Sequence, residues 1–70
     1  MSVELDPDVF GKLPETISQV LDRFNRSGQG IFVSLDASGR VEGIVTDGDI
    51  RRALLSGNAL ASSARRFLNR

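Results

Sequence analysis

The stretch GIVTDGDIRRALL, residues 43–55, joins a short apolar run to a polar turn and two arginines. Its first part, Gly-Ile-Val, has the β-branched character of a strand. Its second part, Ile-Arg-Arg-Ala-Leu-Leu, places apolar residues at helical spacing. Thr46 and Asp49 stand three positions apart where the two parts meet, which is the spacing of a helix capping box. The stretch therefore predicts a strand that runs directly into a helix.

The polar residues at this junction admit two interpretations. As a capping box, the side chains of Thr46 and Asp49 satisfy free backbone donors and need no ligand. As a ligand site, they lie at a helix N-terminus, whose free N–H groups attract phosphate, and the carboxylate can accept from the two hydroxyls of a ribose. Gly48 would let a ligand approach the backbone closely, and Arg51 and Arg52 are the candidate phosphate-binding residues.

A β-hairpin is predicted before this junction. Residues 31–35 are rich in β-forming side chains, and residues 40–46 form the return strand. The connection Asp-Ala-Ser-Gly, residues 36–39, has the chemistry of a type I turn. Gly43 lies within the return strand, so it indicates either a bulge or a point where another group approaches the backbone closely.

Helices are predicted on both sides of the hairpin. The apolar residues of the first share one face and are Leu13, Ile17, Val20, Leu21 and Phe24. Either Thr16 with Gln19, or Pro14, starts this helix, and Gly28 ends it. The apolar face of the second consists of Ile50, Ala53 and Leu54. Ser-Gly-Asn at residues 56–58 ends that helix.

Less regular segments flank this unit. A third helical run is predicted for residues 60–68, whereas residues 9–15 match a strand poorly. Residues 3–5 fit a short strand, or residues 6–7 cap and start a helical turn. The resulting prediction is an α+β fold in which a small sheet packs on two main helices, as one domain over residues 1–70 with a core at about residues 14–57.

Composition limits the chemistry that this chain can perform. Its 70 residues allow one small domain, which buries only about 60% of its unfolded surface. Histidine and cysteine are absent, so the commonest general base and the commonest metal ligands are missing. The pair Asp47 and Asp49 resembles a metal-binding Asp-x-Asp, but no base or nucleophile accompanies it. We expect neither a stand-alone enzyme nor a metal site.

Charge and hydropathy narrow the choice of partners. The net charge is zero, yet residues 51–70 contain five arginines and no acid. These arginines either form a solvated or self-pairing face or contact phosphate groups. Nucleic acid is not expected, since no aromatic residue is interleaved with them. No apolar run approaches the roughly 18 residues of a membrane span, so we expect a cytoplasmic module that binds no membrane.

Together with the hairpin and the first helix, the opening stretch resembles a CBS motif. The family pattern ends in Gly, two apolar residues, Thr or Ser, two further residues and Asp. Here these positions are Gly43, Ile44, Val45, Thr46 and Asp49. The longer TDGDIRRALLSG is similar to CBS motifs attached to sugar-phosphate nucleotidyltransferases and arabinose-5-phosphate isomerases.

The resemblance implies a regulatory module for a small ligand. In the family, the Thr position meets the phosphate or ribose of an adenine nucleotide, and the Asp position accepts from the ribose hydroxyls. These roles fall on Thr46 and Asp49, and apolar residues of the strands, Ile31 with Val33 or Ile44 with Val45, would line the adenine. The expected ligand-binding residues are Gly43, Ile44, Thr46, Asp47, Gly48 and Asp49.

The resemblance also implies a pairing partner. CBS motifs pair, so we expect a homodimer or a pairing with another CBS motif. An adenosine nucleotide such as AMP or ATP, or a nucleotide-sugar, would bind between the two, and no other cofactor is expected. An attached nucleotidyltransferase or isomerase domain is the expected context. The alternative is a structural dimerisation module without a ligand, in which Thr46 and Asp49 serve only as caps.

Overall fold

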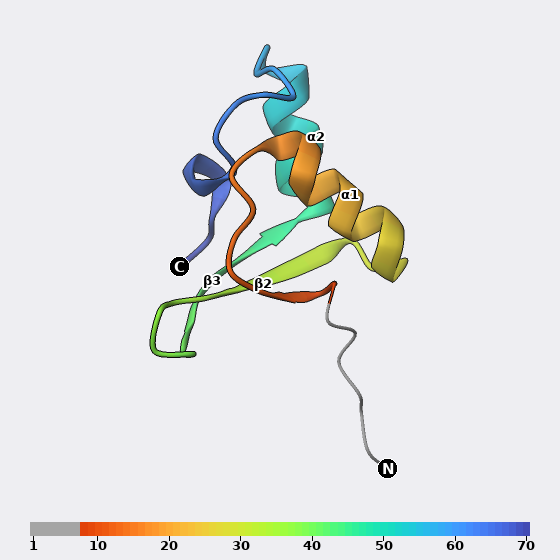
Figure 1. The fold of residues 1–70 in the computed structure, drawn as a ribbon. Coiled ribbons are helices and arrows are strands. Elements are labelled where there is room, and N and C mark those ends of the chain that lie inside the picture. The colour runs from red at the N-terminus through yellow and green to blue at the C-terminus, as the bar shows by residue number, and fades with distance from the viewer. Residues whose placement is uncertain (1–7) are drawn as a thin grey trace.

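A three-stranded sheet carries both helices on one side in the computed structural model, which describes residues 8–70 (Figure 1). The elements are β1 (Phe10–Gly11), α1 (Ile17–Ser27), β2 (Ile31–Leu35), β3 (Val41–Thr46), α2 (Asp47–Leu55) and the 3-10 helix η1 (Ala64–Phe67). The predicted helix, strand, strand, helix order and the α+β class are confirmed. The predictions for residues 3–7 lie outside the described residues. Neither helix of residues 8–70 is long and apolar enough to cross a membrane.

Helix α1 begins and ends as its sequence predicts. The Thr16 hydroxyl accepts from the Gln19 N–H at 3.2 Å, and the Gln19 side-chain oxygen accepts from the Thr16 N–H at 3.2 Å. This capping box, and not Pro14, marks the start of the helix. Gly28 ends it with φ of 71°, a left-handed conformation that glycine adopts without steric cost.

The core lies between the sheet and the two helices. Its buried side chains are those of Leu13, Ile17, Val20, Phe24, Phe32, Val45, Ile50, Ala53 and Ala64. Phe32 and Val45 are fully buried and are paired across β2 and β3. Leu21 and Leu54 pack at the margin of this core. The apolar faces predicted for both helices are therefore confirmed.

The hairpin closes as predicted. The Gly39 N–H donates to the Asp36 carbonyl at 3.0 Å, and Gly39 has φ of 86°. The register of β2 against β3 shifts between Ser34 and Leu35, which face Gly43 and Val41. The shift is a bulge beside Gly43, one of the two outcomes predicted for that glycine.

The segment before α1 corrects the sequence prediction. Residues 9–15 match a strand poorly, yet Phe10 and Gly11 pair with β2 in parallel. The Val33 N–H donates to the Val9 carbonyl at 2.6 Å. The backbone donors and acceptors at the edge of β2 need hydrogen-bond partners. Phe10 and Gly11 supply them and so form a strand, although the strand propensity of their segment is weak.

The segment after α2 also differs from its prediction. The helical run predicted for residues 60–68 is wrong, because only Ala64–Phe67 is helical and that helix is of the 3-10 type. The carbonyls of Leu60 and Ser62 instead accept from the N–H groups of Ser18 and Ile17 at 2.9 and 3.0 Å. The first N–H groups of a helix have no partner within it, and this segment supplies the acceptors.

Candidate functional site

The junction of β3 and α2 contains no intervening loop. Thr46 is the last residue of β3 and Asp47 is the first residue of α2. The Thr46 hydroxyl accepts from the Asp49 N–H at 3.2 Å and donates to Asp49 Oδ2 at 2.7 Å. The Thr46 N–H donates to the same oxygen at 3.1 Å. The two residues therefore form the capping box that their spacing predicts.

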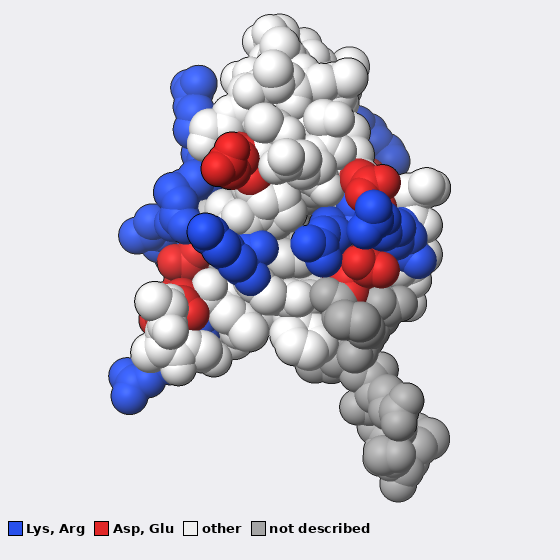
Figure 2. Space-filling model, viewed as in Figure 1, with Lys and Arg blue, Asp and Glu red and all other residues white. Residues whose placement is uncertain are grey.

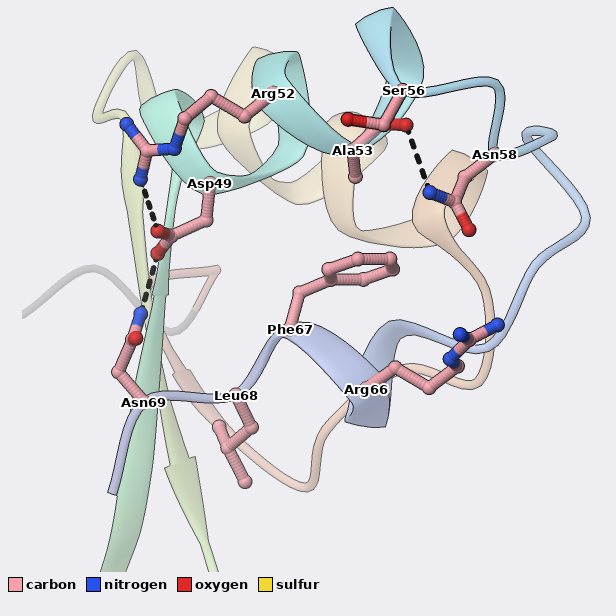
Figure 3. Close-up of a pocket in the computed structure, with 9 residues that line it drawn as sticks. All are labelled: Asp49, Arg52, Ala53, Ser56, Asn58, Arg66, Phe67, Leu68 and Asn69. Carbon is pink, nitrogen blue, oxygen red and sulfur yellow. Dashed lines mark hydrogen bonds and ion pairs between the residues drawn. The ribbon is translucent and has the colours of Figure 1, made fainter.

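The Asp49 carboxylate has two further partners on its outer side. Arg52 Nη2 lies 2.6 Å from Oδ1, and the Asn69 side-chain amide donates to Oδ2 at 2.5 Å (Figure 3). Burial alone would raise the pKa of this carboxyl. The hydrogen bonds from Thr46 and Asn69, with the charge of Arg52, outweigh burial and hold the pKa below its ordinary value. Asp49 is thus an anion whose side chain is 16% exposed.

The neighbours of Asp49 in the DGD sequence lie differently. Asp47 faces outward and pairs with Arg51 at 2.8 Å. Gly48 has no positive φ, and a Cβ at this position would lie 3.5 Å from Arg52 Nη1, an ordinary contact. The fold therefore does not require glycine at position 48. Within residues 8–70 no three acidic side chains gather into a group that could hold a metal ion.

Gly43 and Ile44 contact the C-terminal residues of the chain. Ile44 and Asn69 exchange two backbone hydrogen bonds, each 2.8 Å long. A Cβ on Gly43 would lie 2.6 Å from the Asn69 carbonyl oxygen and 2.8 Å from Leu68 Cγ. The close approach predicted for this glycine is therefore real, and the approaching group is residues 68–69.

The apolar residues expected beside an adenine divide between two faces of the sheet. Val45 is fully buried against the helices, so this residue is unavailable to a ligand. Val33 and Ile44 are paired across β2 and β3 and are partly exposed, as is Ile31. Of the two pairs expected, Ile31 with Val33 stays accessible, whereas only one member of the second pair does.

A cavity of about 340 Å³ opens beside the junction. Its lining residues are Asp49, Arg52, Ala53, Ser56, Asn58, Arg66, Phe67, Leu68 and Asn69. Figure 3 shows the Phe67 ring directed toward α2 and the Arg66 side chain extending away from Asp49.

Only two of the eight predicted site residues, Asp49 and Arg52, line this cavity. The contribution of residues 66–69 was missed. Their sequence shows two apolar residues among arginines, and no signal in it indicates that the chain returns to the edge of β3.

Comparison with known proteins places this chain in a family. The CBS domain model matches residues 4–56, more than half of the chain. This chain is 36% identical over 50 residues to arabinose 5-phosphate isomerase GutQ of Escherichia coli K12. It has the same identity, over the same length, to the protein of that name from Shigella flexneri. The match covers 71% of this chain and 16% of each relative. The chain belongs to the CBS domain family.

Proposed function

We propose that this chain is a regulatory module that pairs with a second copy, or with another CBS motif, and binds an adenosine nucleotide or a nucleotide-sugar. The observation that carries the proposal is the start of α2, where an ionised carboxylate, hydrogen-bonded to a threonine hydroxyl, lines a cavity of about 340 Å³. CBS domains are generally regulatory modules for adenosine ligands, and this generality supports the proposal.

Five residues at or near the junction have a proposed role. Asp49 accepts from the ribose hydroxyls, because an ionised carboxylate is a pure acceptor with two oxygens. Thr46 meets the phosphate or the ribose. Arg51 and Arg52 have side chains that are 70% and 73% exposed, so their guanidinium groups can turn toward a phosphate. Ile44 lies on the adenine side.

Pairing is proposed from exposed apolar side chains. Leu55 at the end of α2 is 82% exposed, and Leu60 in the following segment is 52% exposed. Covering apolar surface contributes about 25 cal/mol per Å². A two-fold homodimer is the commonest closed arrangement that would cover such residues.

The regulated activity is proposed to belong to sugar-phosphate metabolism. The two relatives are named arabinose 5-phosphate isomerases, and this chain matches 16% of their length. We propose an isomerase or nucleotidyltransferase domain as the regulated unit, either attached to the module or bound to it. Catalysis would reside in that unit.

A structural pairing module without a ligand is the second candidate. The observation that favours it is the capping box, which groups of this chain complete by themselves. In this case Thr46 and Asp49 stabilise α2 and do nothing further, and the only function is to hold two chains together.

Calorimetric titration with AMP, ADP, ATP and a nucleotide-sugar tests the proposal. Asp49→Asn keeps one oxygen for the cap but removes the charge and one acceptor. A charge-assisted hydrogen bond contributes roughly 1.5–3 kcal/mol, so we expect affinity to fall about tenfold or more. Thermal melts of both proteins control for folding. If the parent binds none of these ligands, the structural candidate stands. Equal affinity in both proteins would remove Asp49 from the site.

A further inference from the structure

Leu68 and Asn69, named here the closing segment, cover the edge of β3 at the candidate site. Asn69 exchanges two backbone hydrogen bonds with Ile44, and Leu68 packs over the bare backbone of Gly43. The Asn69 side chain then reaches the Asp49 carboxylate at 2.5 Å. Figure 3 shows Asn69 on the opposite side of this carboxylate from Arg52.

The Asp49 carboxylate accepts hydrogen bonds from four donors, three of them at Oδ2. It accepts from the N–H and the hydroxyl of Thr46, from the Asn69 amide and from the Arg52 guanidinium. A carboxylate offers about four acceptor positions. A ribose would bring two more hydroxyl donors. Oδ1, which meets Arg52, has room for one of them, but Oδ2 already accepts from three donors, so at least one donor must leave Oδ2 before a diol can bind both oxygens.

The two donors that can leave are those outside the capping box. Loss of the Thr46 donors would uncap α2, which costs roughly 0.5–2 kcal/mol in other helices. Arg52 is 73% exposed and swings into solvent without disturbing the fold. The Asn69 amide is the other, and it belongs to the residue that exchanges two backbone hydrogen bonds with Ile44.

We propose that the closing segment is an intramolecular competitor for the ribose position: a ligand with a cis-diol displaces Asn69 from Asp49 and releases residues 68–69 from β3. This inference rests on the proposed function and adds a consequence to it. The closing segment is paired with β3 when the site is empty and is released when a ligand is bound. The position of residues 68–69 therefore differs between the free and the bound chain.

Amide hydrogen exchange followed by NMR, on the whole chain with and without AMP, tests the release. The N–H groups of Ile44 and Asn69 should exchange faster when AMP is bound, because they lose their partners in the pairing. Slower exchange of both would mean that the segment closes over the ligand, and that result would overturn the competitor inference.

Affinity for AMP in two asparagine variants gives a second readout. Asn69→Ala removes the competing donor to a charged group, so we expect AMP to bind about tenfold tighter than to the parent. Asn25→Ala is the matched control, since Asn25 is exposed on α1, and its affinity should equal that of the parent. Equal binding by parent and Asn69→Ala would overturn the inference and leave nucleotide binding intact. If neither binds AMP or any other cis-diol nucleotide, the proposed function fails and the inference fails with it.

Discussion

At the scale of single residues, Asp49 combines a structural and a chemical role. Its Oδ2 completes the cap of α2 through the Thr46 N–H, and its Oδ1 meets Arg52. The same acceptors that stabilise the helix start are those that a ribose would use. The cap and the proposed ribose contact therefore use the same carboxylate, which is why a pattern of residue types alone does not separate them.

Gly48 gives the first prediction. It is helical, without a positive φ, and a Cβ would have an ordinary contact at 3.5 Å. Glycine inside a helix is less favourable than alanine by about 0.5–1 kcal/mol. Gly48→Ala should therefore raise the melting temperature by several degrees, measured by circular dichroism. A lower melting temperature would contradict this reading of the backbone. A higher melting temperature with weakened nucleotide binding would show that a ligand approaches this residue.

At the scale of elements, β3 is held between β2 on one edge and residue 69 on the other. Gly43 is the position where both contacts meet, because the bulge and the closing segment both lie beside it. The absence of a side chain there allows the Asn69 carbonyl to approach. A single methyl group added at Gly43 would therefore collide with the closing segment.

Gly43→Ala gives the second prediction. The added Cβ would lie 2.6 Å from a backbone oxygen, so the closing segment must move away. Overpacking of this kind costs about 1–3 kcal/mol, and chemical denaturation should show a loss of that size. In a chain shortened to residues 1–67 the same substitution should cost much less, because the obstructing groups are gone. An equal loss in both chains would place the strain elsewhere.

The elements show how far sequence reasoning reaches. Both capping boxes, the hairpin turn and both apolar helix faces depend on residues within a few positions of one another, and each was predicted. Strand β1 and the extended path of residues 60–63 depend on free backbone groups of β2 and α1. Those backbone groups are distant in sequence from the segments that pair with them, so no local sequence pattern predicts these two segments.

The candidate site follows the same division. Thr46 and Asp49 could be predicted because they lie in one short motif. Asn69 reaches Asp49 from twenty positions away. Its role depends on the route of the chain after α2, which side-chain type and spacing do not encode. The family pattern ends before this residue, since the matched region stops at residue 56.

At the scale of the whole molecule, charges of opposite sign are distributed so that they meet. In Figure 2 most of the basic groups of the visible face gather in two clusters, with acidic groups beside both, and one basic side chain at the lower left stands apart. Among residues 8–70, three carboxyls have pKa values below their ordinary range, namely those of Asp36, Glu42 and Asp49. The Ser38 hydroxyl is the main cause for Asp36, and the Ser34 hydroxyl is the main cause for Glu42.

These lowered pKa values predict acid sensitivity. The unfolded chain has carboxyl pKa values of about 4, so it binds protons before the folded chain does as the pH falls. The contribution of these carboxyls to the free energy of unfolding is therefore fully present above about pH 5. It is lost as the pH falls through their lower pKa values in the folded state. Urea denaturation between pH 7 and pH 2.5 should show this decline, and Glu42→Gln should flatten part of it. A free energy of unfolding that rises on acidification would contradict the assignment.

Assembly gives the last prediction. Among the large apolar side chains of residues 8–70, that of Leu55 is the most exposed, at 82%. Each chain has a mass of 7.6 kDa, and light scattering at micromolar concentration should report twice that value. Full burial of a leucine contributes about 1.5–3 kcal/mol, so Leu55→Glu removes this term twice from a two-fold dimer and should weaken it by about a hundredfold or more. Val41→Glu is the matched control, because Val41 is 63% exposed on β3, away from α2. Loss of the dimer in Leu55→Glu alone places the interface at the end of α2, whereas equal loss in both variants would place it across the sheet as well. A parent that scatters as a monomer would overturn pairing between copies of this chain and leave another CBS motif as the proposed partner.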